Sequence, residues 1–319
     1  MKRRTILQLG VLVLLGMGVL FSLMTFDQAG RRDPELLEVS VIIREADNTG
    51  WSAARQGMEQ AAADLGAELR FLTLSEPDSV EEQRSLLARE VEGGADAVVL
   101  VPADAQALGP DVARAAAGAA VVTMESDLAA SGAKACITVD NAALGTALAK
   151  QMLRDIPQGS GVLLVELTPG NTGVGLRLDE AARVLEEGGC PVYRRTPAPG
   201  QTLAELLDEA LPAQNPGAVA AFEPTALELT ARALQNVENA PPLYGMGATS
   251  TIASYLERGG ISLIAAQNEF AAGYLALQAA VGAARGEALT NIAPMEFSLI
   301  RRQEMYEAEN EKLLFPVTR

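Results

Sequence analysis

The polar side chains of this chain gather in short segments that directly follow runs of apolar residues. Seven such segments can be named: 44–51, which contains the only tryptophan, 102–105, 125–127, 167–177, 223–224, 247–249 and 267–269. Together they supply carboxylate, amide, hydroxyl and guanidinium groups and one indole ring. Groups of these types form strong hydrogen bonds to a small polar molecule when they converge in a desolvated site. The segments are therefore the candidates for a binding site.

Composition excludes several other kinds of chemistry. Among the 319 residues there is no histidine, which rules out Ser-His-Asp and Cys-His catalysis and histidine-ligated zinc. No cysteine spacing is typical of a metal site, so neither a metal nor any other cofactor is expected. The formal net charge is −16, whereas a nucleic-acid-binding protein needs a basic face. We expect no nucleic-acid partner, and an acidic, solvated surface favours a monomer.

The apolar runs alternate with stretches of helical periodicity along nearly the whole chain. Strands are predicted at 39–43, 69–74, 97–101, 121–124, 136–139, 162–165, 192–194, 219–222, 243–246 and 263–266, with an antiparallel edge strand at 295–301. Helices are predicted at 52–65, 80–91, 108–117, 142–154, 177–187, 203–211, 225–237, 251–258 and 271–285. This alternation predicts an α/β fold with two doubly wound parallel-sheet lobes. Ligands of such sheets bind beyond the carboxyl ends of the strands, where the polar segments lie.

The N-terminus suggests that the chain leaves the cytoplasm. Lys2, Arg3 and Arg4 precede an apolar run over residues 6–26, and about 20 apolar residues cross a ~30 Å hydrocarbon core. The run fits a cleaved signal peptide or a retained transmembrane anchor, and both remain open. Either one places everything after residue 36 on the extracytoplasmic side. In an oxidising compartment Cys136 and Cys190 either pair or serve as two small buried hydrophobes.

Four segments, in this order, carry a resemblance to a known family. They are NTGWSAARQGMEQAAADLG (48–66), GADAVVLVPADAQAL (94–108), ITVDNAALGTALA (137–149) and AAQNEFAAGYLALQAAVGAARGE (265–287). From about Val39 to its end the chain resembles the type I periplasmic binding proteins of ABC sugar transport, the ribose-binding group, which shares a core with the lac-repressor effector domain. The resemblance implies three crossovers, near 140, 267 and 292. Lobe 1 would comprise 37–139 with 268–292, lobe 2 would comprise 140–267 with 293–319, and 1–36 would be the signal or anchor.

The resemblance also implies a set of ligand-binding residues. It places Asn48 and Trp51 on the lobe 1 wall of the cleft, Glu125 and Ser126 at the family's position of an acid followed by a polar group, and Arg177 at the start of a lobe 2 helix. Glu223 falls on a common Asn position, and Gln267 falls on the hinge Gln. Three departures from the family pattern stand beside these matches: Gly247 occupies the position of a ligand-binding Asp, Glu223-Pro224 replaces an Asn-Asp pair, and Gly50 replaces a second aromatic residue.

We therefore expect a non-enzymatic, extracytoplasmic solute-binding protein that traps a sugar or sugar derivative between two lobes and presents it to an ABC transporter. The alternative is a membrane-anchored sensor, tethered through residues 6–26, that feeds a two-component kinase. A glycosidase that uses Glu125 and Glu223 as its carboxylate pair is the enzymatic rival. Because Glu125, Asp127 and Glu223 face only Arg177 in this set, an amino-bearing ligand is a further hypothesis.

Overall fold

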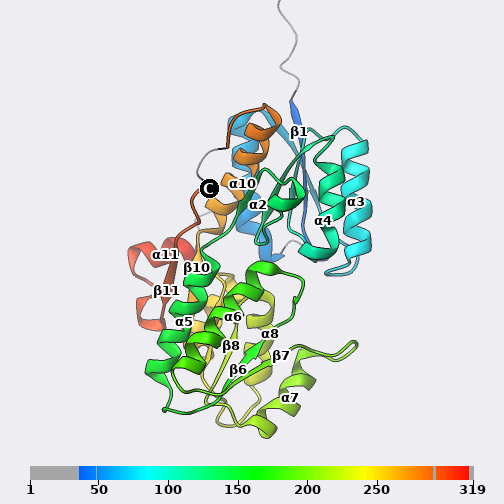
Figure 1. Ribbon diagram of the computed structural model, residues 1–319. Helices are drawn as coiled ribbons and strands as arrows, with labels where there is room; N and C mark the ends of the chain where they lie inside the picture. Colours follow the sequence, from blue (N-terminus) through cyan, green and yellow to red (C-terminus); the bar gives the residue numbers. More distant parts are fainter. Residues whose placement is uncertain (1–35, 48, 290–291, 316–319) are drawn as a thin grey trace, which may run out of the picture. The chain divides into compact units, whose positions relative to one another are not determined.

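Two sheets organise the chain from Leu37 onward, and both belong to one compact unit. The computed structural model describes residues 36–47, 49–289 and 292–315. In Figure 1 one sheet, with its helices, lies in the upper part of the view and the other lies below it. We call the five-stranded sheet with its helices the first lobe, and the six-stranded sheet with its helices the second lobe. The expected α/β fold with two parallel-sheet lobes is confirmed.

The first lobe has the strand order β2-β1-β3-β4-β5, and all its strands are parallel. Its strands are β1 (Leu37–Ile42), β2 (Ala67–Leu72), β3 (Ala97–Leu100), β4 (Ala120–Met124) and β5 (Ala135–Ile137). Its helices are α2 (Ser52–Leu65), α3 (Val80–Glu92), α4 (Ala105–Ala115) and α10 (Glu269–Ala284), with short 3-10 turns at Thr49–Trp51 and Ala129–Ser131. Helices α2 and α10 cover one face of the sheet, and α3 and α4 cover the other.

The second lobe has the strand order β11-β10-β9-β8-β6-β7. Its strands are β6 (Val162–Val165), β7 (Val192–Arg195), β8 (Ala218–Ala221), β9 (Leu243–Met246), β10 (Leu263–Gln267) and β11 (Phe297–Ile300). Its helices are α5 (Asn141–Asp155), α6 (Thr172–Glu187), α7 (Leu203–Gln214), α8 (Pro224–Leu234), α9 (Ser250–Arg258) and α11 (Ala308–Leu314), with a 3-10 turn at Arg302–Glu304. Apart from its edge strand, this lobe repeats the strand order of the first. Strand β11 is antiparallel to β10, which confirms the expected edge strand.

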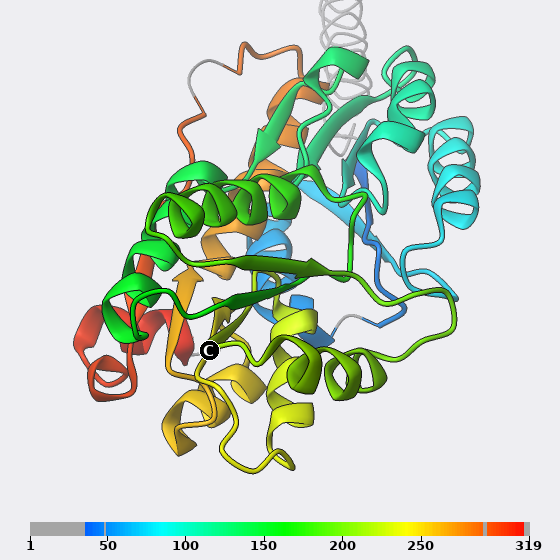
Figure 2. The ribbon, with the colours of Figure 1, turned by 60° about the horizontal axis from the view of Figure 1, so that its bottom comes forward.

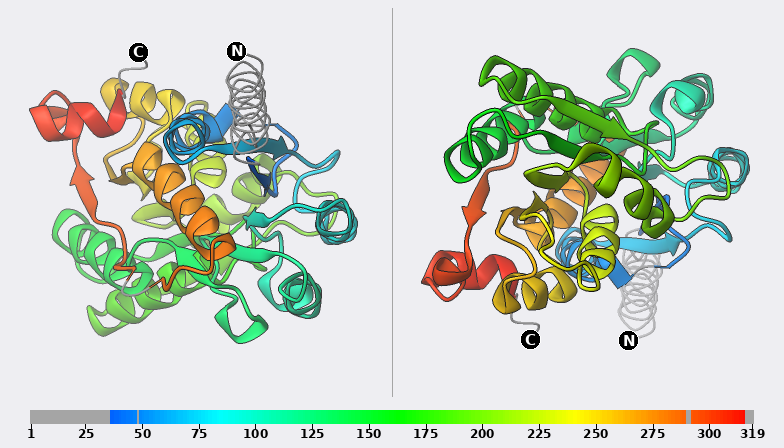
Figure 3. Two further views of the ribbon diagram at one scale, coloured as in Figure 1. Left: turned by 90° about the horizontal axis from the view of Figure 1, so that it is seen from above. Right: turned by 90° about the horizontal axis from the view of Figure 1, so that it is seen from below.

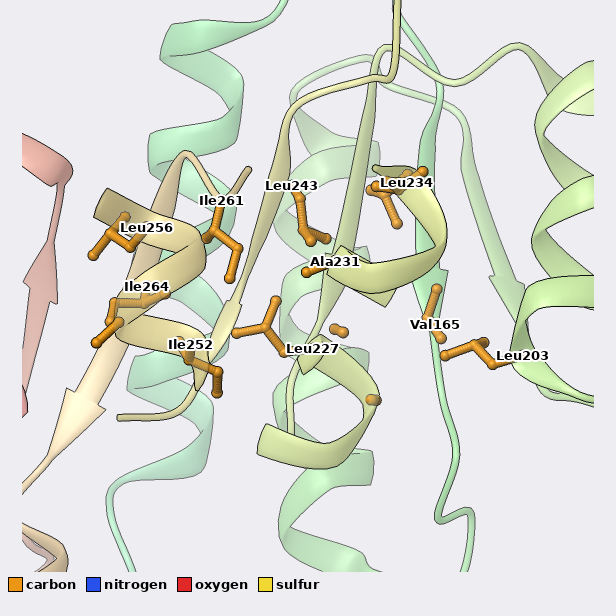
Figure 4. Close-up of a cluster of buried hydrophobic side chains, with 14 of the residues drawn as sticks. Val165, Leu203, Leu227, Ala231, Leu234, Leu243, Ile252, Leu256, Ile261 and Ile264 are labelled. Atoms are coloured by element: carbon orange, nitrogen blue, oxygen red, sulfur yellow. The ribbon is translucent and has the colours of Figure 1, made fainter. Parts of the chain in front are cut away.

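The core explains why the strands appear in the sequence as unbroken apolar runs. In the second lobe, α5 and α6 lie on one face of the sheet while α7, α8 and α9 lie on the other, so strand side chains are buried on both sides (Figure 2). Figure 4 shows one of these layers, in which Leu227 and Ala231 of α8 face Ile252 of α9 and Leu243 of β9. A parallel sheet covered on both faces requires such apolar strands.

Helix boundaries follow the capping residues more closely than the apolar periodicity. Seven helices begin with a side chain that accepts a hydrogen bond from a backbone N–H of the first turn: Ser79, Asp104, Asp140, Asn171, Thr202, Thr249 and Asn268. Helix α4 therefore begins at Ala105 rather than at the expected Leu108. Helix α6 begins at Thr172 rather than Arg177, so the expectation that Arg177 opens this helix is wrong.

Two of the sequence-based expectations concern residues outside the described ranges. They are the N-terminal apolar run over 6–26 and the ligand contact of Asn48. Within the ranges that are described, no helix combines the length and the apolar character that crossing a membrane requires. Cys136 and Cys190 are both free, so they are not paired. Helix α11 was not expected from the sequence.

Two pairs of helices approach each other through glycines. Figure 3 shows α10 running beside α2. A Cβ on Gly57 of α2 would overlap the carbonyl oxygen of Phe270, and a Cβ on Gly273 of α10 would overlap that of Ala54. In the second lobe, a Cβ on Gly145 of α5 would overlap the carbonyl oxygen of Arg177 in α6. Glycine is required at these positions because the two backbones touch directly.

This packing predicts that Gly273→Ala destabilises the protein. The added methyl group must separate α10 from α2, and overpacking of this kind costs about 1–3 kcal/mol in the free energy of unfolding. Denaturant unfolding of the two proteins measures the difference. Gly175→Ala in α6 is the control, because a Cβ there meets nothing within 4 Å and alanine favours a helix. Equal stability of Gly273→Ala and the unaltered protein would contradict the packing argument.

Candidate functional site

The polar segments of both lobes meet at the carboxyl ends of their strands. Arg44 follows β1 in the first lobe and Glu223 follows β8 in the second, and they are 179 positions apart in sequence. A nitrogen of the Arg44 guanidinium group donates a hydrogen bond of 3.1 Å to a carboxylate oxygen of Glu223. Strands β1 and β8 each lie where the strand order of their sheet reverses, which is where doubly wound sheets bind ligands.

Arg44 lies at the centre of a group of carboxylates. Besides Glu223, it forms ion pairs with Asp78 at 3.0 Å, Glu45 at 3.4 Å and Glu125 at 3.7 Å. The side chain is only 4% exposed. Burial would lower the pKa of Arg44, but the surrounding carboxylates outweigh burial and raise the pKa above its ordinary value. Arg44 is therefore a fixed positive charge that holds acidic groups of both lobes together.

Glu223 is the most deeply buried of these carboxylates. One of its oxygens accepts hydrogen bonds from the Thr168 hydroxyl at 2.8 Å and from Arg44, while the other accepts from the backbone N–H of Leu167 at 3.2 Å. Burial raises the pKa of Glu223, against the opposing effect of Arg44. A buried carboxylate with three hydrogen-bond donors is a rigid group, because each donor restricts its orientation.

A second interlobe contact joins the segment after β4 to the N-terminus of α6. The Ser126 hydroxyl donates to the Asn171 side-chain oxygen and accepts from the backbone N–H of Thr172, both at 3.1 Å. The Asn171 amide nitrogen donates to Glu125 at 2.7 Å. Ser126 and Asn171 are fully buried, so the hydrogen bond between them is shielded from solvent. Asn171 thus caps α6 and binds the other lobe at the same time.

Glycines and an unusual backbone conformation allow this contact to form. A Cβ on Gly173 would overlap the carbonyl oxygen of Glu125, and a Cβ on Gly170 would meet Asp104 and the backbone of Ala103 at less than 3 Å. Glu125 itself has a φ of 64°, in the left-handed region that non-glycine residues seldom adopt. Such strain often lies at functional sites, where the surroundings enforce it.

Arg177 lies inside α6 and is almost completely buried. Its Nε donates to the side-chain oxygen of Asn141 at 2.6 Å, and Nη1 donates to the carbonyl oxygen of Phe222 at 2.9 Å. Both acceptors are uncharged. Burial lowers the pKa of Arg177, while the nearby charges of Glu125, Glu223 and Glu269 act in the opposite direction. The guanidinium group is therefore fixed close to carboxylates without a direct hydrogen bond to them.

Two further carboxylates border the same group. Glu45 accepts a hydrogen bond from the indole of Trp51, and burial raises its pKa to about 7 despite the neighbouring Arg44. Glu269, in the first turn of α10, accepts a hydrogen bond of 3.0 Å from Gln267 at the end of β10. Burial also raises the pKa of Glu269 to about 7, and the charge of Glu125 adds to the effect.

We call this set the interlobe network. It consists of Arg44, Glu45, Trp51, Asp78, Glu125 and Ser126 from the first lobe, Asn141, Thr168, Asn171, Arg177, Glu223 and Gln267 from the second, and Glu269 of α10. The sequence-based site residues other than Asn48 all belong to it. Trp51 also packs in the core of the first lobe and is 9% exposed.

The network contains residues that the sequence analysis did not select, among them Arg44, Glu45, Asn171 and Glu269. All four lie in the polar segments that follow strands, so their position was a usable signal. The interlobe partners of Arg44 and Asn171 gave no such signal, because Glu223 and Glu125 lie 179 and 46 positions away from them in sequence. Asn141, which the sequence analysis also did not select, accepts a hydrogen bond from Arg177.

Comparisons with solved structures agree with the arrangement of the two lobes. A carbohydrate transporter solute binding protein from Agrobacterium radiobacter, in complex with D-arabinose, is 20% identical with a TM-score of 0.81, covering 88% of this chain and 100% of that one. GanP, a glucose-galactose binding protein from Geobacillus stearothermophilus, is 17% identical with a TM-score of 0.78, covering 85% and 99%. XylFII in the XylFII-LytSN complex is 18% identical with a TM-score of 0.74, covering 85% and 99%.

Sequence comparison assigns the family. No curated protein matches the chain significantly. Residues 39–288, however, match the family model described as a periplasmic binding protein domain. This region covers both sheets up to the end of α10, and it therefore includes every residue of the interlobe network. Because most of its length matches, the chain belongs to the periplasmic binding protein family.

Proposed function

We propose that this protein binds a sugar or sugar derivative between its two lobes and presents it to an ABC transporter on the extracytoplasmic side of the membrane. The family is one of binding proteins, so the expectation of a non-enzymatic protein is confirmed. Of the similar structures, one is a complex with D-arabinose and another is a glucose-galactose binding protein, which supports a sugar as the ligand.

One observation carries the proposal most directly: within the described residues, three buried polar atoms of the network have no hydrogen-bond partner. They are Nε of Arg44, Oε2 of Glu45 and Oε1 of Gln267. Leaving a buried polar group unpaired costs about 1–3 kcal/mol, so such groups call for an explanation. A ligand with both donor and acceptor groups, such as a polyhydroxylated sugar, would supply the missing partners.

The proposed ligand contacts are Trp51, Glu125, Ser126, Arg177, Glu223 and Gln267, together with Asn48. We assign the lobes to 37–139 with 268–292 and to 140–267 with 293–319. In this proposal the crossovers near 140, 267 and 292 act as the hinge, and ligand favours the closed form because it contacts both lobes. Residues 1–36 would direct export and, if retained, would tether the protein through 6–26.

The partner is proposed to be an ABC permease. The alternative is a sensor kinase, and the similarity to XylFII in its complex with LytSN shows that another protein of this fold binds a second protein. Crosslinking of the full-length protein in membranes, followed by mass spectrometry of the captured chain, separates the two. A captured permease supports the proposal, and a captured kinase replaces it with the sensor.

The proposal predicts that Glu125→Gln weakens ligand binding at least tenfold. This change removes the charge near Arg44 and replaces one of the two acceptor oxygens with an amide donor, and tenfold corresponds to about 1.4 kcal/mol. The ligand is first identified by mass spectrometry of small molecules that co-purify with the protein, and affinity is then measured by calorimetry. Asp127→Asn is the control, because Asp127 is exposed and only caps a turn. A ligand without a hydroxyl-bearing ring would contradict the proposal.

If ligand binding closes the lobes, Gly173→Ala should weaken binding through a steric clash between them. The new Cβ would overlap the carbonyl oxygen of Glu125 in the other lobe, while alanine is favourable within a helix. Affinity should therefore fall at least tenfold without a loss of thermal stability, and the ligand should no longer reduce the radius of gyration in X-ray scattering. Gly175→Ala, two positions along α6, should leave both properties unchanged. Wild-type affinity in Gly173→Ala would exclude this contact from the bound state.

The raised pKa of Glu269 predicts a pH-dependent gain in stability for Glu269→Gln. The folded protein favours the protonated carboxyl group, so the stability it contributes is complete well below pH 5 and is lost as the pH rises through about 7. The substitution avoids this loss. Its advantage should be small at pH 5 and on the order of 1–3 kcal/mol at pH 8, measured by denaturant unfolding of the ligand-free protein.

Glu186→Gln is the control for this measurement, because Glu186 is an exposed carboxylate on α6. It should change stability equally little at both pH values. An advantage of Glu269→Gln that does not grow between pH 5 and pH 8 would show that burial does not oppose ionisation of Glu269. Besides burial, the hydrogen bond from Gln267 and the charges of Glu125 and Arg177 act on the pKa of Glu269.

A further inference from the structure

The interlobe network contains more negatively charged groups than positively charged ones. In the described part of the network there are five carboxylates, Glu45, Asp78, Glu125, Glu223 and Glu269, and two guanidinium groups, Arg44 and Arg177. Full ionisation would leave three negative charges without a compensating positive charge. Carboxylates that share a site repel one another, and this repulsion is costly where water is excluded. Asp78 is 39% exposed, so the cost falls mainly on the other four carboxylates.

The two arginines do not neutralise the excess negative charge of the network. Arg44 is shared among four of the carboxylates, at distances from 3.0 to 3.7 Å. Arg177 donates its hydrogen bonds to two neutral oxygens, those of Asn141 and Phe222. Burial raises the pKa of Glu45 and of Glu269 to about 7, and the charge of Glu125 adds to the effect at both positions, so the site opposes full ionisation of its acids even with Arg44 and Arg177 nearby.

The buried atoms without a hydrogen-bond partner also indicate that the site lacks a donor. Two of those in the network, Oε2 of Glu45 and Oε1 of Gln267, are acceptors that need a donor, and only Nε of Arg44 is a donor. Glu269 is hydrogen-bonded to Gln267, so the unpaired Gln267 oxygen lies next to an acidic group. In the described ranges, no set of three or more His, Cys, Asp or Glu side chains is disposed to hold a metal ion.

We infer that the ligand carries an ammonium group and is an amino sugar. This inference rests on the proposed function, and it names the ligand class of the same site. An ammonium group offers three donors and one positive charge, which match the unpaired acceptors and the excess of carboxylates. Its hydroxyl groups would still occupy the remaining positions, including the acceptor that Nε of Arg44 requires.

Matched pairs of sugars test the inference on the full-length protein, after co-purified ligand has been removed. Calorimetry at pH 7 compares D-glucosamine with D-glucose, D-galactosamine with D-galactose and D-mannosamine with D-mannose, and adds the N-acetyl form of each amino sugar. The amino sugar of a binding pair should bind at least tenfold more tightly than its neutral parent. The N-acetyl form should lose this advantage, because acetylation removes the charge but keeps the nitrogen.

The outcomes separate this inference from the proposed function. If the neutral parents bind as tightly as the amino sugars, the inference is overturned while sugar binding stands. If putrescine binds and no sugar does, the sugar is excluded while the preference for an ammonium group stands. If neither the sugars nor putrescine bind, both are overturned.

Two variants test whether the interlobe network causes the preference for amino sugars over neutral sugars. Glu269→Gln should reduce the ratio of amino-sugar to neutral-sugar affinity about tenfold, because it removes one uncompensated carboxylate and keeps the acceptor for Gln267. Glu186→Gln, on the exposed side of α6, should leave the ratio unchanged. A ratio that is equal in both variants and in the unaltered protein would place the selectivity outside the network and overturn the inference.

Discussion

The structure depends on one buried ion pair, between Arg44 of the first lobe and Glu223 of the second. Removing two charges from water costs several kcal/mol for each ion, and attraction between the two offsets this cost only when further hydrogen bonds complete the site. Glu223 obtains them from Thr168 and the Leu167 backbone, and Arg44 obtains one more from Asp78. Because these partners come from both lobes, the charges are satisfied only where the two strand ends meet.

The same constraint explains why the network destabilises the ligand-free protein. A single arginine shared among four carboxylates cannot neutralise them, so part of the cost of burying charge remains in the ligand-free protein. Perturbed acids of this kind are typical of functional sites, where binding rather than folding supplies the missing interaction. The left-handed backbone of Glu125 adds to that cost. Ligand binding would then stabilise the arrangement that the protein alone holds least easily.

Local patterns in the sequence predicted the fold better than the site. Strands such as 97–101 are apolar throughout because helices cover both faces of the sheet, and this signal needs no knowledge of distant residues. Arg44 and Glu223 lie in polar segments that the sequence identifies, but nothing local pairs two residues that are 179 positions apart. The start of α6 was misplaced because Gly173 and Gly175 interrupt its helical pattern, whereas its cap, Asn171, was the better guide.

Gly173 connects the misplaced start of α6 with the proposed function. Glycine within a helix costs about 1 kcal/mol relative to alanine, so local propensity argues against it at the second position of α6. Its Cα nevertheless lies so close to the Glu125 carbonyl that no side chain fits between the lobes. Gly170, just before the helix, is confined in the same way by Asp104. A residue that is unfavourable for its own helix is thus explained by the opposite lobe, and the requirement arises only because the lobes come into contact.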